Sequence, residues 1–291
     1  MIRVRRADRA AIPGGALVHR GAVVHRTSIA GVLLALGVAS TGCREAEARE
    51  LPPSVILISL DTVRADHLGL YGYERDTSPR LDALAEESSV WEDCYTTAAW
   101  TLIAHMSMLT GLYPTQHGVV AQDARLSPDV PLLAERLAAR GYDTIGLYFE
   151  GWIHARHGFD RGFRVFEAHE DAAEAGEHLR ARMAERDPSR PLFLFVHLFD
   201  AHTVDTRHDE ALLYDPPPPF DRVFVADAPD RFGAGDARKL FIGRRPVDAD
   251  ELEGLTGLYD GALAYLDSVV GALVDDWRAD GLLDRSILVV T

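Results

Sequence analysis

The chain has 291 residues, of which 47% are hydrophobic, as is ordinary for a globular protein, and its length supports one large core or two smaller ones. Its 30 basic and 45 acidic residues give a net charge of −15, which disfavours nucleic-acid binding because a phosphate backbone would be repelled. The two cysteines, Cys43 and Cys94, form neither a metal-type cluster nor a disulfide framework.

The first 43 residues are typical of an export signal. Six arginines precede a short apolar run, 29–38, which is too short for an ordinary membrane span. Ser-Thr-Gly-Cys follows at 40–43 and resembles a bacterial lipoprotein cleavage box, although that box usually begins with Leu. We expect a signal peptide over 1–43 and a lipid on Cys43; secretion without lipid, or an uncleaved anchor, is the alternative. The polar segment 44–53, which ends in Pro-Pro, is typical of a linker.

A near-continuous aliphatic run, 55–60, is typical of a central strand in a parallel sheet. It ends at Asp61, and open α/β sheets bind their ligands beyond the carboxyl ends of such strands. A helix is predicted over 77–87, where proline comes early and apolar residues recur at helical spacing. Residues 90–95 alternate like a short strand, which predicts that Cys94 is a buried thiol.

The next stretch, 101–110, is apolar with small and polar residues at helical spacing, and Gly111 with Pro114 ends it. Thr101 stands where an N-cap would stand. Its hydroxyl is therefore expected beside unpaired backbone N–H groups and the positive end of the helix dipole, where an anionic ester is stabilised. The residues alone leave two interpretations open for Thr101, a helix cap and a reactive hydroxyl.

The rest of the chain continues to alternate helices and strands. We expect a helix over 130–140, a strand over 142–148, a buried strand over 191–198, a long amphipathic helix over 251–280 and a last strand over 286–291. This order predicts an α/β protein with a mostly parallel central sheet.

The motifs resemble, in this order, those of the sulfatase family in the alkaline-phosphatase superfamily. Thr-Leu-Ile-Ala-His-Met-Ser-Met-Leu-Thr-Gly at 101–111 is similar to the family signature Cys/Ser-x-Pro-Ser/Ala-Arg-x-x-x-Leu-Thr-Gly, and closer to variants that read Trp-Thr-Leu-Pro-x-His-x-Ser-Leu-Leu-Thr-Gly. Asp-Thr-Val-Arg-Ala-Asp-His-Leu-Gly at 61–69 and Tyr-Asp-Gly-Ala-Leu-Ala-Tyr-Leu-Asp at 259–267 match as well. The resemblance covers 53–291 and implies an alkaline-phosphatase-like three-layer sandwich.

The resemblance also implies roles for individual residues. Thr101 would be the nucleophile, and Asp61 with Thr101 would hold a divalent metal ion, which could be Ca, Mg, Mn or Zn. His202, in a segment similar to the family's Asp-Pro-His, would bind the ester or protonate the leaving group. His105 stands where the family has Arg and would neutralise or orient the bound group. His197 is expected to be a core residue.

Two departures from the family concern the site. Thr62 stands where the family has a second acidic residue. The Lys of the family's Gly-Lys-Trp-His element is missing from 149–163, where the candidate substitutes are His154, Arg156 and His157.

A third departure concerns the end of the sequence. In the family, the last strand leads into an Asp-His-Gly or Asp-Asn-Gly turn that completes the metal site, and this sequence stops at Thr291, before such a turn. We therefore expect 54–291 to be the truncated, N-terminal part of a sulfatase-like catalytic domain, with a sheet that is incomplete at the C-terminus.

The expected activity is metal-dependent hydrolysis of an anionic sulfuric or phosphoric ester through Thr101. The enzyme would be exported to the cell envelope or periplasm as a membrane-associated lipoprotein, or secreted. Formylglycine arises from Cys or Ser, so Thr101 should remain a plain hydroxyl, which favours phosphate esters. The alternatives are a phosphoryl-group transferase acting on lipid or glycan, since membrane relatives of that kind use Thr, and a non-catalytic surface lipoprotein.

Overall fold

The structure is a computed structural model that describes residues 4–6, 51–203, 213–225 and 246–291. In the first of these ranges, β1 (Val4–Arg6) pairs antiparallel with β3 (Ser89–Trp91). The rest of the predicted signal segment, Cys43 and the linker up to residue 50 lie outside the described residues. Export and lipid attachment therefore stay predictions.

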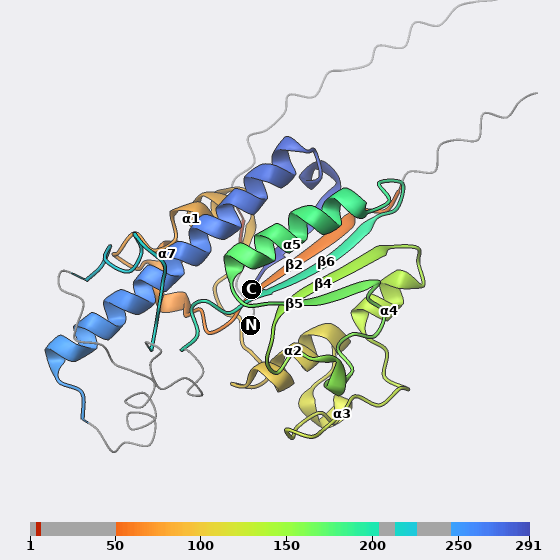
Figure 1. Ribbon diagram of the computed structural model, residues 1–291, viewed down its shortest axis with the longest axis horizontal. Helices are drawn as coiled ribbons and strands as arrows, with labels where there is room; N and C mark the ends of the chain where they lie inside the picture. Colours follow the sequence, from red (N-terminus) through yellow and green to blue (C-terminus); the bar gives the residue numbers. More distant parts are fainter. Residues whose placement is uncertain (1–3, 7–50, 204–212, 226–245) are drawn as a thin grey trace, which may run out of the picture. The chain divides into compact units, whose positions relative to one another are not determined.

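A five-stranded sheet with the strand order β5-β4-β6-β2-β7 forms the centre of the fold, and all its neighbouring strands are parallel (Figure 1). Its strands are β2 (Ser54–Leu60), β4 (Asp143–Phe149), β5 (Val165–His169), β6 (Leu192–Leu198) and β7 (Ser286–Val290). All seven residues of β6 are buried, because β6 lies inside the sheet and helices cover both faces of the sheet. The predicted α/β class is confirmed.

Helices cover both faces of this sheet, which gives three layers (Figure 1). One face packs against α1 (Pro79–Glu86), α5 (Ala172–Glu185) and α7 (Ala249–Ala279), and the other against α2 (Thr101–Thr110) and α4 (Leu133–Ala138), while the short α3 (Pro114–His117) packs against α2. Successive side chains of a strand point to opposite faces, so Ile56 and Ile58 join the first core and Leu57 joins the second.

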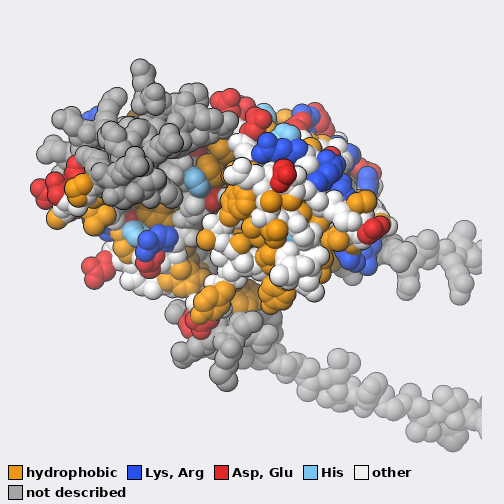
Figure 2. Space-filling view, turned by 90° about the horizontal axis from the view of Figure 1, so that it is seen from below, with side chains coloured by type: hydrophobic (Ala, Val, Ile, Leu, Met, Phe, Trp, Pro, Cys, Tyr) orange, Lys and Arg blue, Asp and Glu red, His pale blue; other side chains and the backbone are white. Residues whose placement is uncertain are grey.

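Four short 3-10 helices connect these elements: η1 (Ala65–His67), η2 (Gly69–Tyr71), η3 (Ala155–His157) and η4 (Leu283–Arg285). Among the described helices, α7 has the length and apolar composition that a membrane span needs, but 78% of its most apolar window is buried inside the fold. It is therefore the core helix of the domain. On the side seen in Figure 2, apolar side chains gather in the middle and charged side chains lie mostly around them.

Several predicted boundaries shift in the structure. Helix α4 is shorter than predicted, because Pro131 precedes it and its first turn begins only at Leu133. Strand β3 ends at Trp91, so Cys94 lies in a loop and is exposed; the predicted burial of its thiol is wrong. Strand β5 and helix α5 were not predicted, because β5 is only partly buried and the buried face of α5 consists mostly of small residues, which give a weak hydrophobic signal.

Candidate active site

The carboxyl edge of the sheet brings three polar side chains together. Asp61 follows β2, Thr101 opens α2, and His197 lies near the end of β6. The Thr101 hydroxyl donates to Asp61 Oδ2 over 3.0 Å, and His197 Nε2 donates to the same oxygen over 3.0 Å. Because an ionised carboxylate can only accept hydrogen bonds, the Thr101 hydroxyl and His197 Nε2 must both be donors.

Asp61 is ionised in this setting. Burial by itself would raise the pKa of Asp61, but the hydrogen bonds from His197 and Thr101 outweigh it and hold the pKa below the ordinary value. Both hydrogen bonds end on Oδ2, and among the described residues no donor reaches Oδ1. One anionic oxygen therefore remains available to a cation.

Thr101 does not have the position predicted for it. The N-cap of α2 is Trp100, and Thr101 is the first helical residue. The prediction of an N-cap is wrong by one residue, and the described hydrogen bond of the hydroxyl side chain goes to Asp61. Of the two interpretations left open by the sequence, the structure supports a hydroxyl that faces an ionised group at a helix N-terminus.

His105 ties α2 to the sheet. Its Nδ1 must donate to the Thr101 carbonyl oxygen, 2.8 Å away, so its Nε2 accepts from the Ser59 hydroxyl, also at 2.8 Å. Burial lowers the pKa of His105 to about 4, so the ring is neutral at pH 7. A neutral ring cannot neutralise a bound anion, whereas the orienting role predicted for His105 agrees with these contacts.

His197 is the residue that sequence reasoning placed correctly in the core but did not connect to the site. Its ring lies edge-on to His105, with 4.9 Å between centroids, and its Nδ1 is buried without a described partner. Asp61, His105 and His197 each bring one potential ligand atom within 4.8 Å of the others. Ser59 and His197 are paired neighbours on β2 and β6, and this register is not visible in the sequence.

The structure does not bring His202 into contact with Asp61 or Thr101 through any described hydrogen bond. Its ring stacks on Phe199 with 4.0 Å between centroids, and Phe199 stacks on Phe149 at 4.3 Å. Nδ1 of His202 donates to the Thr203 carbonyl oxygen over 2.7 Å, and no described hydrogen bond involves its Nε2. The role of His202 stays a prediction.

The loop that lacks the family's Lys packs beside Thr101. Trp152 lies edge-to-face with Trp100, with 4.9 Å between ring centroids, and the Arg156 guanidinium lies 5.6 Å from the Trp152 centroid. Arg156 Nε donates to Nε2 of the buried His157 over 2.9 Å. His154 Nδ1 accepts from the Arg156 backbone N–H, so His154 and His157 both make hydrogen bonds within the loop. Of the three candidate substitutes for the Lys, Arg156 is the exposed one.

Comparison with known proteins places most of the chain in one family. The family model described as Sulfatase matches residues 53–291. Arylsulfatase A of Bos taurus is 32% identical over 133 residues, which are 41% of this chain and 26% of that protein. An arylsulfatase of Clostridium perfringens is 32% identical over 95 residues, which are 32% of this chain and 20% of that protein. The chain thus spans about a quarter of the length of these relatives.

Solved structures show the same fold. The C-terminal periplasmic domain of EcEptC from Escherichia coli, in complex with Zn, matches with a TM-score of 0.54 and 21% identity, over 80% of this chain and 62% of that one. The phosphonate monoester hydrolase of Agrobacterium radiobacter matches with a TM-score of 0.57 and 19% identity, over 82% and 62%. The predicted three-layer architecture is confirmed.

Proposed function

The chain belongs to the sulfatase family, and from this premise we propose that it hydrolyses an anionic phosphoric or sulfuric ester through the hydroxyl of Thr101. The observation that carries the proposal is the 3.0 Å hydrogen bond from Thr101 Oγ1 to the ionised Asp61. This bond fixes the hydroxyl at the N-terminus of α2, where the helix dipole stabilises an anion.

A divalent metal ion fits the donors that the site presents. Asp61 Oδ1 accepts from no described donor, and the Thr101 hydroxyl lies beside the same carboxylate. Asp61 and Thr101 would hold the ion, which when bound acts as a Lewis acid toward the ester. Oxygen donors suit Ca, Mg, Mn and Zn, whereas the ring nitrogens of His105 and His197 that face the site are already used in hydrogen bonds to Ser59, Thr101 and Asp61.

Side chains of the protein would carry out the remaining steps of the reaction. Thr101 Oγ1 attacks the phosphorus or sulfur while the bond to the leaving oxygen breaks. His202 is the candidate to protonate that oxygen, and Arg156 is the candidate to bind a non-bridging ester oxygen. His105 orients Thr101 through its backbone carbonyl oxygen, and His197 orients Asp61 through its carboxylate.

The nucleophile favours phosphate over sulfate. A threonine sulfate has no formylglycine hydrate from which sulfate can be eliminated, so water must attack sulfur, whereas a phosphothreonine is more easily attacked at phosphorus. Among the matched structures, one is named a phosphonate monoester hydrolase and another a phosphoethanolamine transferase of Campylobacter jejuni. The second name supports, as an alternative, transfer of a phosphoryl group to a lipid or glycan.

Substrate assays separate these activities. Aryl phosphate, bis-aryl phosphate and aryl sulfate are each incubated with the protein and with Ca, Mg, Mn or Zn in turn, and Thr101→Ala is the control. We expect faster release from the phosphates than from the sulfate. Faster sulfate release would contradict the preference, and release that rises with an added glycan or lipid acceptor would favour the transferase. Equal release by Thr101→Ala would contradict the nucleophile.

We also propose that the protein works outside the cytoplasm, on a membrane surface to which a lipid on Cys43 attaches it. The signal-like composition of 1–43 supports this, and three of the matched structures are periplasmic domains. The net charge of −15 makes nucleic acid an improbable partner.

A further inference from the structure

The turn that follows Asp61 has a strained backbone. Thr62 has a φ of 58°, and among the described residues it is the only one other than glycine with a positive φ. A β-branched side chain is unfavourable in this conformation, because its two branches crowd the backbone. Such conformations persist only where surrounding contacts fix them. A contact that holds Thr62 therefore also fixes the direction in which Asp61 leaves the strand.

The phenol of Tyr259 provides this contact from α7. Its hydroxyl donates to the Thr62 carbonyl oxygen over 2.8 Å and accepts from the Arg64 N–H over 2.9 Å, so one oxygen bridges both sides of the turn. Tyr259 is 6% exposed, and burial raises its pKa to about 12, so it remains a donor at any physiological pH.

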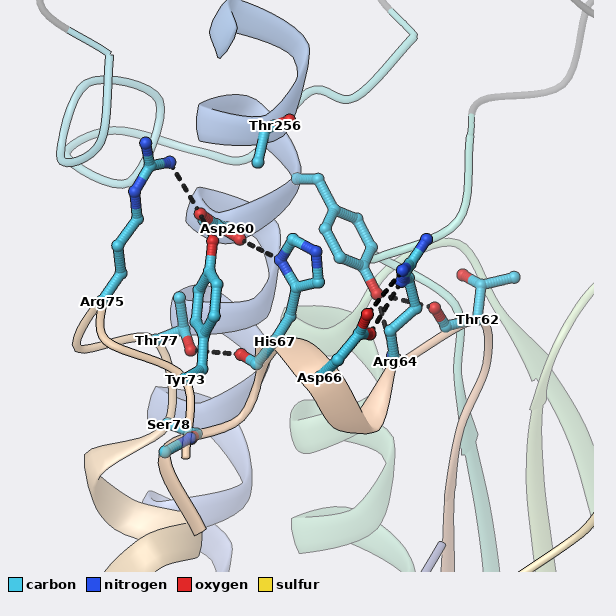
Figure 3. A network of polar contacts seen from close by, with 12 residues as sticks. Thr62, Arg64, Asp66, His67, Tyr73, Arg75, Thr77, Ser78, Thr256 and Asp260 are labelled. Carbon is cyan, nitrogen blue, oxygen red and sulfur yellow. Dashed lines mark hydrogen bonds and ion pairs between the residues drawn. The ribbon is translucent and has the colours of Figure 1, made fainter. Parts of the chain in front are cut away.

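The next residue of α7 fixes the other end of the same segment. Asp260 is fully buried, and its Oδ1 accepts from His67 Nδ1 over 2.7 Å. Its Oδ2 accepts from the Tyr73 hydroxyl over 2.7 Å and from Arg75 Nη1 over 2.8 Å (Figure 3). Asp260 thus holds the downstream part of the segment, while the Thr62 turn is held by the bridge from Tyr259 and by the bond from the Thr62 hydroxyl to the Asp61 carbonyl oxygen.

We infer that Tyr259 is a positioning residue: it holds the Thr62 turn in its left-handed conformation and thereby aims the Asp61 carboxylate at Thr101. The inference rests on the proposed function, in which Asp61 holds a metal ion beside the nucleophile. If the Tyr259 phenol only stabilised α7, its contribution to the free energy of unfolding would not depend on which residue stands at position 62. The two roles therefore differ in their coupling to Thr62.

The first experiment measures this coupling without metal. Melting temperatures are compared for Tyr259→Phe, Thr62→Gly and the double variant, because glycine adopts a positive φ without steric cost. Tyr265→Phe, two turns along the same helix, is the matched control. We expect Tyr259→Phe to lower the melting temperature less in the Thr62→Gly background than in the parent. Equal losses in both backgrounds would overturn the inference.

The second experiment measures affinity for Zn²⁺ and for Mn²⁺ by calorimetric titration. We expect Tyr259→Phe to weaken binding at least about tenfold, as loss of an outer contact to a ligand commonly does. Tyr265→Phe should stay within about twofold of the parent, and Thr62→Gly should restore part of the loss in Tyr259→Phe. Unchanged affinity in Tyr259→Phe would overturn the inference. If the parent binds neither ion, Asp61 and Thr101 do not hold the metal by themselves, and the melting-temperature comparison alone decides the positioning role.

Discussion

His197 Nε2 donates to Asp61 Oδ2 over 3.0 Å, and both side chains are at most 9% exposed. The contact crosses from β6 to β2, where His197 is the paired neighbour of Ser59. Because the carboxylate oxygen is shared with Thr101, His197 orients the same group that faces the nucleophile. It is thus part of the site although it lies inside a strand.

His197→Ala should weaken binding of Zn²⁺ or Mn²⁺ by roughly 10–100-fold, because Asp61 loses the donor that orients it. Calorimetric titration of the two ions measures the loss. His117→Gln is the matched control, since His117 is a buried histidine whose described hydrogen bonds go to Ser107 and Val119 and not to Asp61 or His197. Equal affinities for His197→Ala and the parent would contradict an orienting role.

Thr101→Ala should abolish ester turnover and leave the fold intact. The substitution removes one hydrogen bond to a charged group, which contributes about 1.5–3 kcal/mol to stability, and it removes no helix cap. Activity is followed with an aryl phosphate, and unfolding by circular dichroism. Thr101→Ser should retain measurable turnover because it keeps the hydroxyl. Turnover by Thr101→Ala that matched Thr101→Ser would rule out the proposed nucleophile.

Two buried histidines should make the fold sensitive to acid. Burial lowers the pKa values of His105 and His169 to about 4, from an ordinary value of 6.5. Between these pH values the unfolded chain binds protons that the folded chain does not, so stability is lost as the pH falls from 6.5 toward 4. The slope is up to about 1.4 kcal/mol per pH unit for each histidine.

Urea unfolding at pH 7, 6 and 5 measures this slope. In His169→Gln one of these groups is gone, so the loss of stability between pH 6.5 and 5 should be smaller than in the parent, by up to about 1.4 kcal/mol per pH unit. A variant whose stability depends on pH as steeply as the parent's would show that His169 does not contribute.

Cys43→Ser should release the exported protein from membranes, because the predicted lipid attachment site is lost. A single acyl chain binds a membrane only weakly, so stable attachment requires several chains on that cysteine. Fractionation of cells and mass spectrometry of the N-terminal peptide test the prediction. An unlipidated peptide from the parent, together with unchanged fractionation of the variant, would show that the protein is not a lipoprotein.

Local sequence patterns located much of this molecule. The aliphatic run before Asp61 is strand β2, and the apolar stretch with Gly111 after it is helix α2, whose start was predicted within one residue. These elements depend on neighbouring residues, whose periodicity and end signals are visible in the sequence.

Contacts between distant segments were not predictable in the same way. That His197 reaches Asp61 depends on the parallel register of β6 with β2, and these residues are 136 positions apart. The neutral state of His105 likewise follows from burial and from its two partners, which no local pattern specifies. The family resemblance could therefore single out Asp61, Thr101 and His105 as candidates, but not the arrangement that joins them.

The edge-to-face pair of Trp100 and Trp152 gives the protein an intrinsic spectroscopic probe beside the candidate site. Trp100 is bonded directly to Thr101, so a ligand that displaces the loop carrying Trp152 will change the excitonic coupling of the two indoles. Trp277, which is 3% exposed on α7, supplies a steady background emission against which that change can be read. Near-ultraviolet dichroism and fluorescence quenching can thus follow occupancy of the site in real time, with neither a label nor a chromogenic ester.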